Sequence, residues 1–405
     1  MIPTFEDETG RRRTWLAEEP DSRRSWLVAV LGAMAMVFTF GTPLSYGIFH
    51  QPFSDAFDIS LVAMSTVFSI MLFTFFIGSG VVGVFAARLP ARAVLLACAG
   101  ATGLLGPALY VTESYLGLVA VFGVLGLALG TTYVLIASII PRWFETRRGA
   151  ATGLIFVGNG LGLFLLPPLW QLAFARLDVR SGFLVIMSVT AVVFALAGLA
   201  CRRPRWTTQS STTAGDLLEW VSRLAGSRSF HLLFVAVGLA FAWYQLLAAY
   251  AVDLFAARGL TDAGASGAFG LIGGVSIISR IGSGYAADSV GSRRAFVASL
   301  ICVGAGVGLL LAPQPPALWL SIFLIGIGLG GAATLYIPLL MGIFDPDKDT
   351  AIVGIFNVAA GVGALAMPPL GAATIAYTDG YAVVILLTFA MVALSVALTI
   401  VGTSS

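Results

Sequence analysis

The chain has 405 residues, of which 58% are hydrophobic and only 10% are charged, whereas soluble domains contain about a quarter charged residues. This composition excludes an ordinary water-soluble domain and indicates a protein that mostly contacts lipid. The net charge of +2 is a small difference between 22 basic and 20 acidic residues, so it gives no reason to expect a nucleic-acid partner.

The chain begins with a polar segment, residues 1–25. It holds three consecutive arginines and lacks the short apolar core and small-residue cleavage site of a secretory signal peptide. We therefore expect residues 1–25 to be a cytoplasmic tail.

Twelve apolar runs follow, each bounded by charged residues, proline or glycine. A helix needs roughly 20 mainly apolar residues to cross the hydrocarbon layer, and the runs have about this length or more. They lie at 26–50, 61–86, 91–111, 115–140, 149–174 and 181–201, and then at 229–256, 266–288, 294–312, 317–343, 351–376 and 380–402. The sequence predicts an all-α membrane protein with 12 transmembrane helices, divided by a polar linker (202–228) into six-helix halves at 26–201 and 229–402.

The two halves repeat each other at an offset of 201 residues. The matching pairs are Gly153 and Gly354, Gly160 and Gly361, Gly162 and Gly363, Pro167 and Pro368, Pro168 and Pro369, Gly83 and Gly284, and Arg92 and Arg293. Such a duplication, with a substrate site between the halves, is one of the known designs of transporters.

The distribution of basic residues predicts the orientation, because cytoplasmic loops collect Lys and Arg. With the N-terminus inside, the cytoplasmic segments contain 18 basic residues and the outer loops contain 3. We therefore expect both termini to be cytoplasmic, in a multi-pass protein of the cell (inner) membrane. The one remaining basic residue is Arg280.

The eighth run ends in the segment GYAADSVGSRR, residues 284–294. A glycine turn here lets Asp288, Arg293 and Arg294 pair between helices at the membrane face, which predicts a latch for one of two conformations. The segment resembles the signature loop of the major facilitator superfamily, which recurs after the second and eighth helices. The first half has Ala87 where that family has Asp.

A second set of motifs sharpens the resemblance. These are RWFETRRGAATG at 142–153, GNGLG at 158–162, two prolines at 167–168, and PLSYGIF at 43–49. They resemble the monocarboxylate transporter and oxalate:formate antiporter branch of the superfamily, in span order over nearly the whole chain. The resemblance implies a carrier that works by alternating access.

Arg280 is the main candidate for substrate binding. At 1.5 Å per residue it lies roughly 20 Å from the outer end of its span and about 12 Å from the inner end. A charge at this depth usually faces a cavity and marks a functional site. A structural pair with a buried acid is the alternative, but no Asp or Glu lies in the middle of any span. The guanidinium fork matches a carboxylate, so we expect a substrate anion.

The family comparison points to a single carboxylate. Branch members that exchange dicarboxylates carry a Lys in span eleven, whereas residues 352–376 here contain no charge. Mammalian monocarboxylate carriers have Asp where this chain has Ser276 and Lys where it has Leu44. These two departures leave the route of the proton open.

Further polar residues lie in spans that line the pore in this superfamily or pair across it. Each of them also has a plainer interpretation, as a helix-packing, interfacial or interhelical hydrogen-bonding residue. The candidates are Tyr46, Tyr133, Tyr244, Gln245 and Tyr336, with Asn159 and Asn357 in the fifth and eleventh spans and Asp253 as the candidate for proton coupling. His50 and His231 lie at span ends, where an interfacial role is expected.

Together these patterns predict a monomeric secondary transporter of small monocarboxylates such as lactate or pyruvate, with H⁺ as the co-substrate that the resemblance implies. The alternatives are an anion exchanger of the oxalate and formate type, an exporter of larger hydrophobic compounds, and a membrane sensor. No nucleophile with a His base, metal cluster or phosphate-binding loop is apparent, and Cys98, Cys201 and Cys302 lack disulfide or metal spacing. We expect no enzyme activity, no metal and no cofactor.

Overall fold

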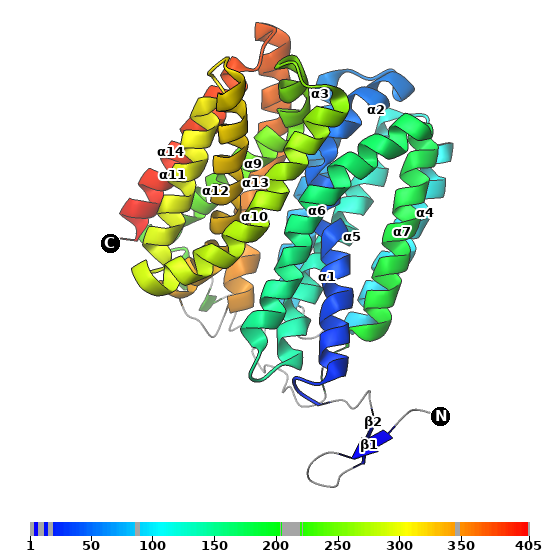
Figure 1. Ribbon diagram of the computed structural model, residues 1–405, viewed down its shortest axis with the longest axis vertical. Coiled ribbons are helices and arrows are strands. Elements are labelled where there is room, and N and C mark those ends of the chain that lie inside the picture. The colour runs from blue at the N-terminus through cyan, green and yellow to red at the C-terminus, as the bar shows by residue number, and fades with distance from the viewer. Residues whose placement is uncertain are drawn as a thin grey trace.

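The computed structural model describes residues 4–6, 12–14, 19–85, 90–202, 204, 219–220, 222–344 and 349–403. Within these ranges, 12 helices are long and apolar enough to cross a membrane, which confirms the predicted all-α architecture (Figure 1). Two short antiparallel strands, β1 (Thr4–Glu6) and β2 (Arg12–Thr14), precede the bundle. Ala87 of the first-half loop, most of the linker and Lys348 lie outside the described residues.

The helices alternate in direction along the chain. Those of the first half are α1 (Arg23–Leu44), η1 (Tyr46–Phe49), α2 (His50–Phe57), α3 (Leu61–Phe85), α4 (Ala91–Val111), α5 (Tyr115–Ile139), η2 (Ile140–Trp143), α6 (Arg148–Arg176) and α7 (Val179–Ala200). Those of the second half are α9 (Arg228–Ala257), α10 (Asp262–Val290), α11 (Ser292–Leu309), α12 (Pro315–Met341), α13 (Asp349–Thr378) and α14 (Ala382–Gly402).

Several helices begin at a side chain that caps their first turn. Ser114, Asp178, Ser227 and Thr261 each accept hydrogen bonds from backbone N–H groups of the helix that follows. The first N–H groups of a helix have no partner within it, so such caps stabilise the start by about 1 kcal/mol. Three of these caps, at Ser114, Asp178 and Thr261, let a long apolar helix begin directly after a very short loop.

The first apolar run differs from its prediction. It was expected to form one span at 26–50, but α1 ends at Leu44 and the chain continues as the 3₁₀ turn η1 and the short helix α2. Pro43 lies in the last turn of α1 and has no N–H to donate, which weakens helical hydrogen bonding there. The Ser45 N–H and hydroxyl both donate to the Gly41 carbonyl, at 2.9 and 2.6 Å. The apolar run therefore extends past the end of the α-helix.

The two halves contact each other mainly through α6 with α10 and α3 with α13. Glycines allow a very close approach of α6 and α10. A Cβ at Gly160 would lie 2.3 Å from the Ile277 side chain, and one at Gly273 would lie 2.3 Å from the Leu163 side chain. Small residues at helix interfaces permit this kind of contact in membranes.

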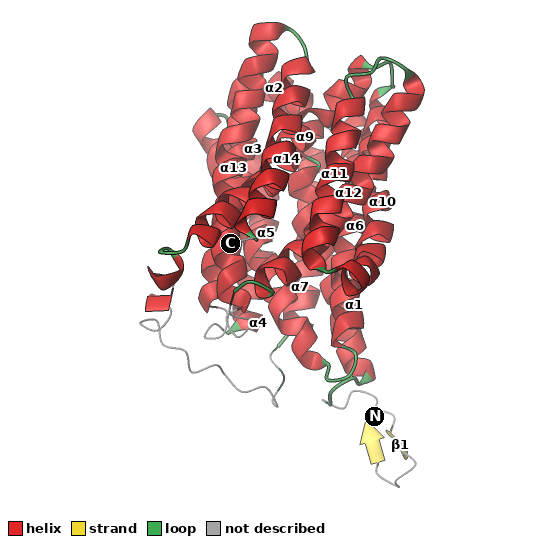
Figure 2. Ribbon diagram, turned by 90° about the vertical axis from the view of Figure 1, so that its left-hand side faces the viewer, coloured by secondary structure: helices red, strands yellow, loops and turns green. Residues whose placement is uncertain are grey.

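The bundle has two ends, which we name by their elements. The N-terminal face contains the start of α1, the end of α5 and the start of α6; the opposite face contains η1, α2 and the end of α9 (Figure 2). At the N-terminal face Asp21 accepts backbone hydrogen bonds from Glu145, Thr146 and Arg147. These donors, with that of Thr146 the strongest, lower the pKa of the Asp21 carboxyl. These hydrogen bonds hold the segment before α1 against the loop before α6.

Candidate functional site

A small pocket of about 20 Å³ lies between the halves around Arg280. The structure brings four other predicted residues to the same pocket: Tyr133 on α5, Asn159 on α6, Tyr336 on α12 and Asn357 on α13. Both halves therefore contribute polar side chains to one central site. This is the arrangement expected of a carrier whose halves move about its substrate.

The guanidinium group of Arg280 is buried, because the residue is only 7% exposed. Its Nε and Nη2 atoms have no hydrogen-bond partner among the described residues. These two nitrogens lie on the same edge of the guanidinium plane, so their N–H bonds point in parallel. Leaving buried donors unpaired is costly, and a bidentate oxyanion such as a carboxylate would satisfy both.

Aromatic rings form most of the pocket wall, and the sequence did not single them out. They are Phe40, Phe75, Phe76, Phe156 and Phe241. A phenylalanine within an apolar run gives no signal of its own. The internal repeat could have pointed to two of them, because Phe40 and Phe241 are separated by the same 201 residues as the repeated glycines and prolines.

Phe40 and Phe241 also line two neighbouring cavities of about 20 and 30 Å³. One ring comes from α1 and the other from α9, so each half contributes one. The two rings therefore divide the centre of the protein into three small spaces instead of one larger site.

Two predicted residues lie beside this centre. Tyr244 and Gln245 line one neighbouring cavity, where Gln245 donates to the Ala360 carbonyl at 3.2 Å. The Tyr244 hydroxyl is buried and has no partner among the described residues. Both are therefore adjacent to the Arg280 pocket but do not line it.

Tyr46, also predicted to line the cavity, lies outside all three spaces. Its hydroxyl donates to the Met64 carbonyl at 2.9 Å, and its ring stacks on Phe68 at a centroid distance of 4.4 Å. The side chain is fully buried. Its position follows from the break after α1, which turns residue 46 into the aromatic packing near the opposite face.

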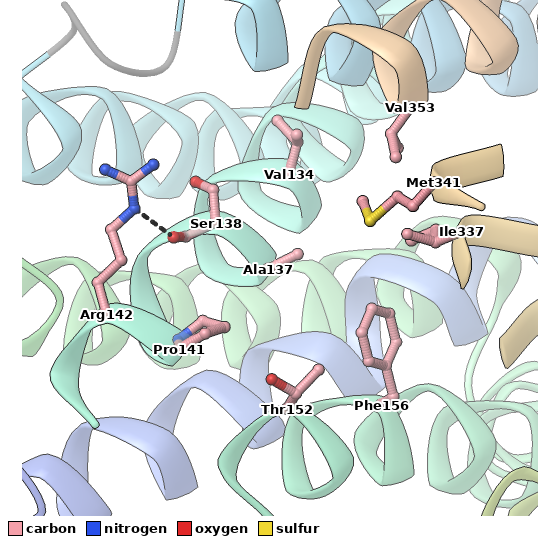
Figure 3. A pocket seen from close by; sticks show the side chains of 10 residues that line it. All are labelled: Val134, Ala137, Ser138, Pro141, Arg142, Thr152, Phe156, Ile337, Met341 and Val353. Atoms are coloured by element: carbon pink, nitrogen blue, oxygen red, sulfur yellow. Dashed lines mark hydrogen bonds between the residues drawn. The ribbon is translucent and has the colours of Figure 1, made fainter. Parts of the chain in front are cut away.

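A larger cavity of about 400 Å³ occupies the N-terminal face between the two halves. We call it the vestibule. The ends of α5 and α12 and the starts of α6 and α13 form its wall, and Figure 3 shows the Phe156 ring pointing into the space beside Ile337 and Met341. Phe156 lines both the vestibule and the Arg280 pocket. The pocket is therefore approached from the N-terminal face past this ring.

The opposite face is closed by contacts between the halves. A Cβ at Gly47 would lie 2.8 Å from the Ala248 carbonyl oxygen, so η1 packs directly on the α9 backbone. Next to it, His50 Nδ1 lies 3.5 Å from Asp253 Oδ2. Asp253, the residue predicted to couple protons, thus contacts a histidine from the other half. The vestibule lies on the N-terminal face, whereas the two halves are in contact on the opposite face. The structure is therefore open toward the N-terminal face.

The predicted latch residues are exposed at the junction of α10 and α11. Arg293 donates to the Ile400 carbonyl at 3.0 Å, at the end of α14. Asp288 forms no ion pair with Arg293, Arg294 or any other described residue in this conformation. A latch through Asp288 stays a prediction for the other conformation of the cycle.

Comparison with known proteins agrees with this architecture. The family model described as Major Facilitator Superfamily matches residues 26–289 and 232–404. The chain is 28% identical over 280 residues to the MFS-type transporter pytF of Aspergillus terreus, which covers 66% of this chain and 90% of that protein. It is 25% identical over 359 residues to monocarboxylate transporter 13 of Rattus norvegicus, which covers 86% of this chain and 80% of that protein.

A solved structure shows the same fold. It is the crystal structure of a bacterial homologue of the human lysosomal transporter Spinster in an inward-facing and occupied conformation. The TM-score is 0.72 at 12% identity, covering 94% of this chain and 97% of that one.

Proposed function

This chain belongs to the Major Facilitator Superfamily, and from that premise we propose that it carries small monocarboxylates across the membrane by alternating access. Arg280 binds the carboxylate, and the two halves rock about the central pocket. The superfamily and its transporter relatives place the chain among multi-pass transporters and not among enzymes.

The observation that carries this proposal is the pair of unpartnered, parallel N–H donors on Arg280 inside a pocket shared by both halves. A buried arginine that forms no ion pair with any described residue stabilises an anion that enters the pocket. The described part of α13 from residue 352 to 376 contributes no second basic residue. One positive charge suits one carboxylate, which favours monoanions over oxalate.

The charges of the loops support an orientation of the protein in the membrane. The N-terminal face contains the basic-rich loops, so it is proposed to be cytoplasmic, with both termini on that side of the cell membrane. In this orientation the vestibule opens to the cytoplasm, and the structure corresponds to an inward-open state.

Uptake into proteoliposomes tests the proposal. Labelled lactate, pyruvate and acetate are expected to enter and to compete with one another, whereas oxalate competes weakly. A carrier of the exchange type would need substrate on both sides, so vesicles without internal substrate separate the two modes. Broad competition by large hydrophobic compounds, with no effect of the small acids, would contradict the proposal and favour an exporter.

We propose proton symport, which the resemblance to monocarboxylate carriers implies and which would make the net charge moved with each monoanion zero. We expect uptake to be stimulated by an inward proton gradient. If Asp253 carries this coupling, Asp253→Asn loses the stimulation by the gradient but keeps exchange of labelled for unlabelled substrate.

Asp262→Asn is the matched control for that experiment, because Asp262 is exposed at the start of α10 on the same face. It should keep the full response to the gradient. A parent-like response in Asp253→Asn would exclude Asp253 as the coupling residue, and electrogenic uptake indifferent to pH would exclude symport.

A further inference from the structure

The second unpartnered group in the Arg280 pocket is the amide of Asn159. This side chain is only 2% exposed, and its Oδ1 atom is buried without a hydrogen-bond partner among the described residues. A buried carbonyl oxygen without a donor is unfavourable, so a group that donates to it is expected to bind. The pocket thus presents two donors on Arg280 and one acceptor on Asn159.

The other asparagine of the pocket differs in this respect. Asn357 donates from Nδ2 to the Ser79 hydroxyl at 3.0 Å, a contact that joins α13 to α3 across the two halves. Its amide has a structural partner, whereas that of Asn159 does not. The tyrosine hydroxyls of Tyr133 and Tyr336 can each donate or accept, so they do not distinguish between substrate groups. Asn159 Oδ1 is the atom of this pocket that requires a donor.

We propose that the pocket selects monocarboxylates with a hydroxyl group next to the carboxylate, with Asn159 Oδ1 accepting the hydroxyl hydrogen while Arg280 holds the carboxylate. The inference rests on the proposed transport of monocarboxylates and names the class of acid within it. Both groups line the same small pocket, so a small acid whose hydroxyl is next to its carboxylate, a 2-hydroxy acid, can engage both.

A 2-oxo acid of the same size is the informative comparison. Its keto oxygen has no hydrogen to donate, so it faces the Asn159 oxygen as a second acceptor and leaves both unsatisfied. Sites that hydrogen-bond a substrate hydroxyl reject analogues that lack it more strongly than apolar pockets reject a missing methylene. We expect the 2-hydroxy acid to bind roughly ten-fold or more tightly than the 2-oxo acid.

The test measures competition against labelled substrate by lactate, pyruvate and propionate, which share three carbons and one carboxylate. In the parent protein lactate should compete best. In Asn159→Leu, which replaces the amide by an apolar side chain of similar size, the ratio of lactate to pyruvate affinity should fall toward one. Gln171→Leu is the matched control, because Gln171 lies on the same helix, α6, but outside the Arg280 pocket, so this variant should preserve the ratio.

The outcomes separate this inference from the proposed function. Equal affinities for lactate and pyruvate in the parent would overturn the role of Asn159, and so would an unchanged ratio in Asn159→Leu. A preference for pyruvate would also overturn it, because the Asn159 amide would then donate to the keto oxygen. In each of these cases competition that depends on Arg280 leaves the proposed function standing. If none of the three acids competes, the proposed function itself fails.

Discussion

Arg280→Ala is expected to reduce uptake of monocarboxylates by about 100-fold or more. Each hydrogen bond to a charged group is worth about 1.5–3 kcal/mol, and the variant removes two of them together with the positive charge. Arg280→Lys keeps the charge but presents a compact ammonium instead of two parallel N–H donors. We expect this variant to lose most of the uptake as well, because binding of the carboxylate depends on the two parallel N–H donors and not on the charge alone.

Initial rates of uptake at several substrate concentrations measure this effect, with the amount of folded carrier determined for each variant. Arg176→Ala is a suitable control, since Arg176 is an exposed arginine at the end of α6. It should transport like the parent. Parent-like uptake in Arg280→Ala would refute the assignment of the binding site, and parent-like uptake in Arg280→Lys would refute bidentate binding alone.

Gly273→Ala is expected to reduce transport about ten-fold by disturbing the contact between the halves. A Cβ at this position would lie 2.6 Å from the Leu163 carbonyl carbon and 2.7 Å from the Phe164 nitrogen, which are backbone atoms that cannot rotate away. Overpacking of this kind typically costs 1–3 kcal/mol, which corresponds to a roughly 5- to 150-fold shift between conformations. The arrangement that opens toward the N-terminal face should become rarer because it contains this contact.

The same helix offers a matched control for this substitution. A Cβ at Gly282 would meet nothing within 4 Å, so Gly282→Ala should transport like the parent. The conformational shift can be measured by the rate at which a thiol reagent labels Met341→Cys in the vestibule, which should fall when Gly273→Ala is added. Equal labelling and equal uptake in both glycine variants would show that the α6–α10 contact does not limit the cycle.

The spans were predictable because every segment that crosses lipid must be apolar and must satisfy its backbone hydrogen bonds within itself. All twelve apolar runs correspond to helices, and short loops left little freedom in their order. The end of the first span was misplaced because Ile48 and Phe49 extend the apolar run past Leu44, although Ser45 and His50 make this stretch less apolar than the helix before it. The α-helix ends just after Pro43, where the Ser45 hydroxyl donates to the Gly41 carbonyl. Tyr46 was consequently expected in the central cavity and lies elsewhere.

The centre of the site was predictable only where charge or polarity marked it. Arg280, Tyr133, Tyr336, Asn159 and Asn357 stand out against apolar runs, and the structure brings these five together. The aromatic wall has no such contrast with its surroundings. Which phenylalanines face the pocket depends on the rotation of each helix, and rotation is determined by packing with neighbouring helices that the sequence does not display.

The two phenylalanines that divide the centre have a consequence for affinity. An acid longer than the Arg280 pocket fits only when Phe40 and Phe241 turn aside and join the three spaces. The measured dissociation constant of such a ligand is its intrinsic value divided by the fraction of molecules in that joined arrangement. If about one molecule in a hundred has both rings aside, a longer acid appears about 100-fold weaker than its contacts alone would make it. We therefore expect the division to select against longer acids, because only the small fraction of molecules with both rings turned aside can bind them.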